Sequence, residues 1–110
     1  MNPVLPAPIA SYFSAKSGRD TEAILACFTP TATVVDEGEN KTMNGHQAIR
    51  EWLEGPIADY NLTTEVTGSS ERDGDYVVTA LVSGDFPGSP VNLEHAFRVH
   101  GDNIVSLEIR

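Results

Sequence analysis

The sequence from residue 91 to residue 109 reads VNLEHAFRVHGDNIVSLEI. In its first ten residues, every second position is apolar or a histidine: Val91, Leu93, His95, Phe97 and Val99. This alternation predicts a β-strand with one buried face. Gly101-Asp102 predicts a tight turn, and residues 103–109 predict a strand that returns beside the first. The stretch therefore predicts an antiparallel hairpin.

Residues 62–83 predict a second pair of strands. Residues 62–70 alternate, and Asp73-Gly74 is a strong signal for a tight turn. Residues 76–83 are apolar on both faces, which is typical of a central strand covered on both sides. Residues 84–90 hold two glycines and two prolines and predict a loop.

The first half of the chain predicts three helices, near residues 8–17, 20–28 and 45–55. The first has a buried stripe at helical spacing, made of Ile9, Tyr12, Phe13 and Lys16. In the second, Asp20 caps the start, Phe28 falls on the buried edge and Pro30 ends the helix. A strand over residues 31–36 is expected next, because its residues are β-branched or small.

A charged turn over residues 37–41 follows that strand in the prediction. Asn44 then opens the third helix, with Gln47 as its partner in a capping box. Together these elements predict one α+β domain over residues 1–110. We expect a cone-shaped α+β roll, with three N-terminal helices packed on a curved, mainly antiparallel sheet and a cavity between the two layers.

The composition narrows the class of partner. A net charge of −9 disfavours nucleic acid and anionic membrane surfaces, because both repel an acidic protein. The start of the chain predicts no signal peptide, and no stretch reaches the roughly 18 apolar residues of a membrane span. Cys27 is the single cysteine and has no internal partner for a disulfide. These features predict a cytoplasmic protein.

Three residues are candidates for a catalytic site. Asp36 shares a strand face with Val34 and Ala32, so its carboxylate is expected at the edge of an apolar cavity. Burial disfavours the charged form and makes such a carboxylate a better proton acceptor. Asp36 also begins the Asp-Glu-Gly turn, where aspartate is common for structural reasons.

His95 and Tyr12 are the other two candidates. His95 lies in the apolar row of its strand, where a buried imidazole needs a hydrogen-bond partner, either within the core or on a ligand. Tyr12 lies on the buried stripe of the first helix and has a hydroxyl to satisfy, although plain core packing explains it too. The predicted lining of the pocket is aromatic: Phe13, Trp52, Tyr60, Phe86 and Phe97. For the first four of these, plain core packing is the more common role of such a residue. The three histidines do not have metal-ligand spacing, and no metal or organic cofactor is expected.

Several stretches resemble the nuclear transport factor 2-like superfamily, in particular its SnoaL-like branch. They are Tyr12-Phe13, Gly18-Arg19-Asp20, residues 26–36 (ACFTPTATVVD), residues 44–52 (NGHQAIREW) and residues 104–109 (IVSLEI). The resemblance implies the same α+β roll. It leaves the activity open, because the superfamily hosts isomerases, dehydratases, cyclases and non-catalytic binders on one scaffold.

The ketosteroid isomerases of this superfamily have a tyrosine on the first helix that donates to the substrate oxyanion, and an aspartate on the first strand that shuttles the proton. Tyr12 and Asp36 match those two places. The isomerases' second oxyanion donor is a protonated aspartate on a late strand. Its place falls on His95 if Phe97-Arg98 is matched, or on Glu94 if the last hairpin is aligned without a gap. The strand alternation favours His95, and neither residue is an aspartate.

Two functions remain open from the sequence. The first is a cofactor-independent isomerase or polyketide-cyclase-like enzyme that moves a proton α to a carbonyl of a small apolar or cyclic ligand, with Asp36 as base and Tyr12 and His95 polarising the carbonyl. The second is a non-catalytic ligand-binding or dimerisation module. In either case we expect a homodimer that buries part of the outer sheet face, near Val77, Thr79 and Leu81.

Overall fold

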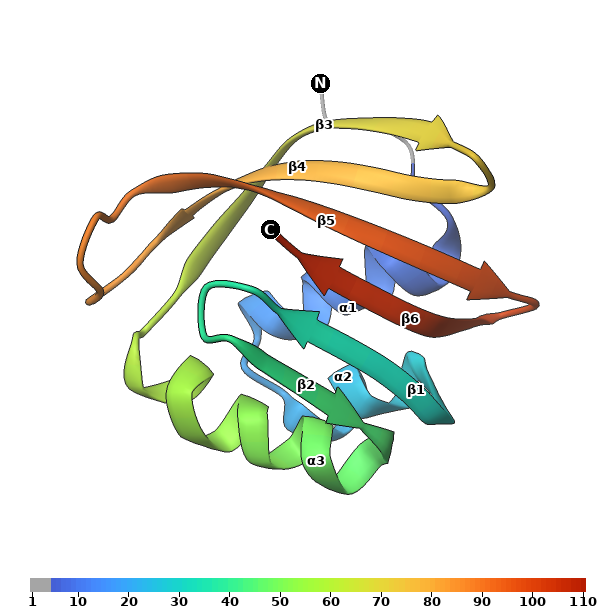
Figure 1. The fold of residues 1–110 in the computed structure, drawn as a ribbon, viewed down its shortest axis with the longest axis horizontal. Coiled ribbons are helices and arrows are strands. Elements are labelled where there is room, and N and C mark those ends of the chain that lie inside the picture. The colour runs from blue at the N-terminus through green and yellow to red at the C-terminus, as the bar shows by residue number, and fades with distance from the viewer. Residues whose placement is uncertain (1–4) are drawn as a thin grey trace.

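The computed structural model describes residues 5–110 and has helices on one side of a single sheet. The helices are α1 (Ala7–Ser17), α2 (Thr21–Ala26), α3 (Gly45–Trp52) and a π-helical turn η1 (Leu53–Ile57). The strands are β1 (Phe28–Asp36), β2 (Lys41–Asn44), β3 (Thr63–Arg72), β4 (Asp75–Ser83), β5 (Val91–His100) and β6 (Asn103–Ile109). Figure 1 shows this order along the chain.

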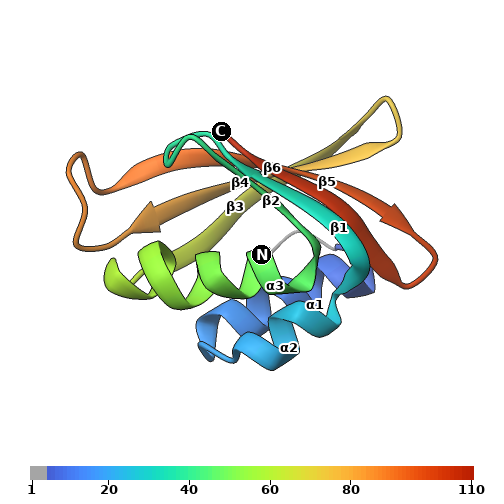
Figure 2. The ribbon, with the colours of Figure 1, turned by 60° about the horizontal axis from the view of Figure 1, so that its bottom comes forward.

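The sheet is curved, and its strands lie in the order β2-β1-β6-β5-β4-β3. β1 and β6 are parallel, and the other neighbours are antiparallel. Figure 2 shows α1, α2 and α3 on the concave side of the sheet. The α+β roll with a mainly antiparallel sheet is therefore confirmed. No helix in residues 5–110 is long and apolar enough to span a lipid bilayer.

The turn chemistry explains why β3 and β4 form a tight hairpin. Asp73 and Gly74 have φ values of 53° and 83°, the left-handed backbone that a two-residue hairpin turn requires. Asp20 also has its predicted role, because its side chain accepts a hydrogen bond from the Ala23 backbone N–H at 3.1 Å.

The prediction for α2 was wrong at its end. The helix ends at Ala26, and Phe28 begins β1 opposite Ile104 of β6. Pro30 lies inside β1, where the pairing with β6 is irregular between Phe28 and Thr33. A proline fits a strand at such an irregularity, because no ladder hydrogen bond from its nitrogen is needed there.

The region before α3 also differs from the prediction. Residues 41–44 form the short edge strand β2, which pairs with β1. Asn44 is the N-terminal cap residue, but its side chain accepts from the Thr33 hydroxyl at 2.8 Å instead of capping the helix. Gln47 donates to Glu51 at 3.2 Å, so the predicted capping box is absent. Cross-strand pairing to β1 replaced the local helix cap.

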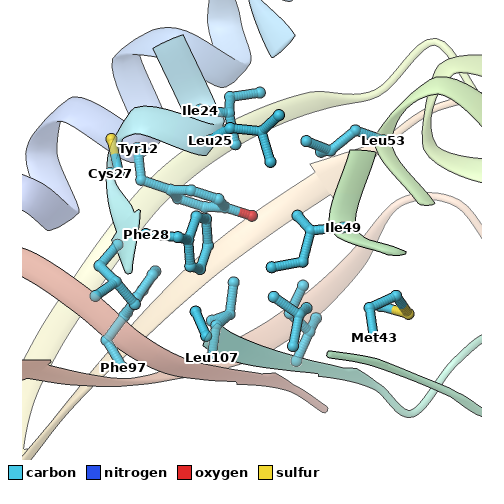
Figure 3. Packing of buried hydrophobic residues seen from close by; sticks show 14 of the residues in the cluster. Tyr12, Ile24, Leu25, Cys27, Phe28, Met43, Ile49, Leu53, Phe97 and Leu107 are labelled. Carbon is cyan, nitrogen blue, oxygen red and sulfur yellow. The ribbon is translucent and has the colours of Figure 1, made fainter. Parts of the chain in front are cut away.

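The hydrophobic core lies where α1 and α3 face the middle of the sheet. Val34 of β1, Leu107 of β6 and Phe97 of β5 are cross-strand neighbours, and all three are buried. We call these three residues the core row. The rings of Tyr12 and Phe28 pack with this region, as Figure 3 shows, and the ring centroids of Tyr12 and Phe97 are 5.5 Å apart.

Candidate functional site

Two predicted site residues lie at the same level of the sheet, two positions along the strands from the core row. Asp36 of β1 pairs with Ile109 of β6, and Ile109 pairs with His95 of β5. We call these three residues the site row. Neighbouring strands are about 4.8 Å apart, so about 10 Å separates the Asp36 and His95 backbones. A small molecule lying over Ile109 can therefore contact both side chains.

The site row forms part of the wall of a cavity of about 440 Å³, which we call the site cavity. Its aliphatic lining comes from η1, from the residue before β3, and from β4, β5 and β6: Ile57, Leu62, Val82, Val91, Leu93 and Ile109. Its lining also includes two carboxylates, an amine and an imidazole, from Asp36, Glu39, Lys16 and His95. A mostly apolar cavity with a few convergent polar groups is the usual form of a small-molecule site.

The Asp36 carboxylate is buried and held by two N–H donors. The Trp52 indole nitrogen donates to Oδ2 at 2.9 Å, and the Glu39 backbone nitrogen donates to Oδ1 at 3.3 Å. Asp36 therefore stabilises the turn after β1 and also lines the site cavity. Each carboxylate oxygen accepts more than one hydrogen bond, so a bound ligand can still use them.

His95 is buried on β5, with Phe13 at the edge of its ring at 5.4 Å and Phe97 stacked at 6.3 Å. Burial, together with the nearby positive charge of Lys16, lowers the pKa of His95 to about 3. The imidazole is therefore neutral at physiological pH. Its Nδ1 has no hydrogen-bond partner among the described residues. A buried polar group without a partner is uncommon and is a candidate for contact with a ligand.

Lys16 is a site residue that the sequence analysis did not single out. It lies in the last turn of α1, and its ammonium is 5.6 Å from the centroid of the Tyr12 ring and 6.0 Å from that of Trp52. Burial lowers the pKa of Lys16 to about 8, and the negative charge of Asp36 opposes this shift. The signal in the sequence was a lysine on the otherwise apolar stripe of the first helix.

Tyr12 is completely buried and lies beside the site cavity without being one of its lining residues. Its hydroxyl has no hydrogen-bond partner among the described residues. Figure 3 shows this hydroxyl within the apolar cluster, on the side of Ile49 and Leu53. Burial is the main cause of a raised pKa for Tyr12, followed by the charge of Asp36. The structure thus places Tyr12 in the core next to the site.

The predicted aromatic lining divides into two groups. Tyr60 and Phe86 line the site cavity, and their rings meet edge to face at 5.7 Å. Phe13, Trp52 and Phe97 do not line it, because they pack in or against the hydrophobic core. Trp52 still contacts the site through its hydrogen bond to Asp36. Sequence alternation identifies buried residues, but it does not distinguish a cavity wall from filled core.

Close packing between two loops holds the rim of the site cavity. The Asp85 backbone nitrogen donates to the Tyr60 carbonyl at 2.7 Å, and the Asn61 side chain donates to the Asp85 carboxylate at 2.9 Å. A Cβ added to Gly84 would lie 2.6 Å from the Tyr60 carbonyl oxygen, so this approach requires glycine. These contacts keep Tyr60 and Phe86 together at the rim.

The arrangement supplies a proton acceptor and two nitrogen-bearing groups around an apolar space. Asp36 can accept a proton from a bound molecule, while Lys16 and His95 can interact with its oxygen. Within residues 5–110, no group of three or more His, Cys, Asp or Glu side chains is placed to hold a metal ion.

Comparison with known proteins identifies the family. The family model of the SnoaL-like domain matches residues 9–107. A candidate polyketide cyclase from Sinorhizobium meliloti is 37% identical, with a TM-score of 0.89 over 96% of this chain and 95% of that chain. A comparison with curated protein sequences gave no match.

More distant solved structures share the fold. A protein from Catenulispora acidiphila with a ketosteroid isomerase-like fold, solved in complex with trimethylamine, is 21% identical, with a TM-score of 0.82 over 97% of this chain and 86% of that chain. TerC, co-crystallised with polyporic acid, is 18% identical, with a TM-score of 0.80 over 94% of this chain and 86% of that chain. From the match over residues 9–107, this chain belongs to the SnoaL-like domain family.

Proposed function

We propose that the site cavity binds a small, mostly apolar carbonyl compound and that the protein catalyses proton transfer α to the carbonyl. The observation that carries this proposal is the buried Asp36 carboxylate, which two N–H donors orient at the wall of an apolar cavity. An oriented carboxylate within an apolar site is a suitable general base, because water does not compete for its lone pairs.

In the proposed reaction, Asp36 removes a proton from the carbon next to the carbonyl. The electrons move onto the carbonyl oxygen, and the Lys16 ammonium and the neutral His95 imidazole stabilise the resulting enolate. Asp36 then returns the proton at a different carbon, which is an isomerisation, or the enolate attacks a second carbonyl in the same ligand, which is an aldol-type cyclisation. The name of the 37% identical Sinorhizobium protein supports the second outcome.

The experiment begins with a screen of small cyclic ketones and polyketide-like compounds for binding, followed by exchange of their α-protons in deuterated water. Asp36→Asn keeps the shape of the side chain but removes the proton acceptor. We expect the exchange rate to fall by on the order of 10²–10⁴-fold, the contribution typical of a general base. Ligand affinity is expected to stay nearly the same. Glu37→Gln, which neutralises an exposed carboxylate next to Asp36, is the matched control.

The alternative function, a non-catalytic binding module, predicts a different result. A ligand that binds while its exchange rate is the same with wild type and Asp36→Asn would rule out the catalytic role and leave ligand binding as the function. Circular dichroism of both variants separates loss of chemistry from loss of fold.

We also propose that two copies of the chain pair through the outer face of the sheet. Val77 of β4 and Ala96 of β5 are cross-strand neighbours on this face, and Leu81 lies further along β4. Figure 2 shows that no helix covers it. Sedimentation is expected to give a dimer, and Leu81→Glu is expected to shift it toward monomer, because a charge in an apolar interface is costly. A wild-type monomer at high micromolar concentration contradicts this proposal.

A further inference from the structure

Lys16 differs from the three arginines that form salt bridges. Arg50 pairs with Glu22, Arg98 with Asp75, and Arg110 with Glu94 and Glu108. Lys16 forms no salt bridge within residues 5–110 and lies over aromatic rings at the wall of the site cavity. A long, flexible amine in this position is free to meet a ligand rather than committed to a carboxylate.

Lys16 also stands between two hollows. Besides the site cavity, it lines a second hollow of about 390 Å³, together with Ser17, Thr21 and Asn61. Ile57 and Leu62 are shared by both hollows as well. The Lys16 side chain therefore borders both the site cavity and a second, more polar hollow.

The groups that face Lys16 decide which chemistry its nitrogen supports. The Asp36 carboxylate on β1 and the His95 imidazole on β5 line the same cavity, and the Tyr12 and Trp52 rings pack beside the ammonium. Because the pKa of Lys16 is lowered to about 8, an appreciable share of the side chain is the neutral amine near physiological pH. A neutral amine is a nucleophile, and an ammonium ion is not.

We propose that the Lys16 side chain bonds covalently to the carbonyl carbon of an aldehyde or ketone in the site cavity and forms a protonated Schiff base. This proposal rests on the cavity of the proposed function and deepens it, because it narrows the ligand to carbonyl compounds that react with amines.

The step needs only a proton from water besides the two reactants. The neutral amine adds to the carbonyl carbon, so a C–N bond forms, the C=O π electrons move to oxygen, and this oxygen takes a proton from the amine nitrogen. The carbinolamine oxygen then takes a second proton, from solvent, and leaves as water, so that a C=N double bond with one proton on nitrogen remains. Nothing is oxidised or reduced. Hydrolysis reverses the sequence and frees the lysine.

The neighbouring groups suit each stage of this sequence. The positive Schiff base has the Asp36 carboxylate in the same cavity, so its charge is compensated. The carbon next to a protonated C=N bond also loses a proton more readily than the carbon next to a carbonyl, so Asp36 as base yields an enamine. His95, which is neutral, adds no opposing positive charge near the Schiff base.

The test uses acetylacetone, a small diketone whose amine adduct is a conjugated enaminone that absorbs in the near ultraviolet. Cyclohexanone with cyanoborohydride is the second probe, because reduction makes its adduct permanent and measurable by mass. The chain contains only one other lysine, the exposed Lys41, which serves as an internal control. Peptide mapping then distinguishes Lys16, Lys41 and the α-amino group.

We expect adduct at Lys16 to exceed adduct at Lys41 by roughly tenfold or more at pH 7.5, because the neutral fraction of an ordinary lysine is far smaller at that pH. Lys16→Arg keeps the charge but removes the nucleophile, and it should abolish the ultraviolet band, whereas Lys41→Arg should leave it unchanged. Equal modification of Lys16 and Lys41 in wild type would overturn the proposal, and this result needs no variant to fold.

The same experiment separates this inference from the proposed function. If no adduct forms, and Lys16→Arg still exchanges α-protons in an Asp36-dependent manner, the acid–base proposal stands and the covalent one fails. If the adduct forms but exchange is insensitive to Asp36→Asn, the covalent proposal stands and Asp36 is not the base.

Discussion

The core row and the site row are built on the same three strands, two residues apart, and they have opposite characters. Val34, Leu107 and Phe97 in the core row are apolar and covered. In the site row, the flanking positions of β1 and β5 are an aspartate and a histidine, and all three members line a cavity. One step of the strand alternation therefore separates a closed core from a candidate active site.

The helices explain the difference. The Tyr12 ring of α1 packs against Phe97 and Phe28 and fills the space over the core row. Over the site row, the same helix presents Lys16 one turn later, which is long and only partly buried. Tyr60 and Phe86 also line the space left at this level, and their rings meet edge to face. The space between α1 and the sheet is therefore filled by side chains over the core row and remains a cavity over the site row.

Each region contains one buried polar atom without a hydrogen-bond partner in residues 5–110. In the core it is the Tyr12 hydroxyl, and in the site row it is His95 Nδ1. The former is surrounded by apolar side chains, whereas the latter belongs to a residue that lines a cavity. An unpartnered buried atom therefore indicates function only when a ligand or water can reach its residue.

Burial of His95 should make the free energy of unfolding depend strongly on pH, and this is the largest effect that we expect. Between pH 6.5 and about 3, the unfolded chain binds a proton at His95 that the folded chain does not bind. The free energy of unfolding should therefore fall as the pH decreases through this window, by up to about 1.4 kcal/mol per pH unit from this residue, and this loss is absent above it. His95→Leu should lose stability less steeply in urea unfolding between pH 7 and pH 4.5.

His100→Leu is the matched control for this measurement, because His100 lies on the same strand but is exposed. Its unfolding curves should follow those of wild type at every pH. Carboxylates that titrate in the same range affect all three proteins alike, so the comparison of slopes isolates His95. Equal slopes for wild type and His95→Leu would mean that His95 is hydrated in the folded protein.

Most of the fold was predictable because it depends on short-range patterns. The strand at 91–100, the Asp73-Gly74 turn and the loop before Val91 each have a strong local signal, and all three are present. Phe28 was misassigned because an apolar residue after a helix fits either element until its partner is known. That partner, Ile104, is far away in the sequence.

The candidate site was predictable to a smaller extent. Alternation placed Asp36 and His95 on the inner face, and the structure brings both to one cavity. Lys16 was overlooked because a lysine on an apolar stripe is usually explained by its alkyl chain. Glu39 belongs to the predicted charged turn over residues 37–41, and it lines the cavity because its backbone N–H bonds to Asp36. Such placements depend on tertiary packing, which periodicity does not encode.

The smallest expected effect concerns Tyr12→Phe in the closed region. The hydroxyl is buried without a partner, so removing it should leave the free energy of unfolding unchanged or raise it by about 1 kcal/mol. The ring contacts with Phe28 and Phe97 remain, which keeps the core row filled. Because Tyr12 does not line the site cavity, proton exchange in a bound ketone should change little.

The measurements are urea unfolding and the deuterium exchange assay on the same preparation. A loss of exchange on the order of 10²–10³-fold, the effect of removing one oxyanion donor, would show instead that the hydroxyl reaches the ligand. In that case the resemblance to the isomerases would extend to Tyr12, and the boundary between the two rows would open when a ligand binds.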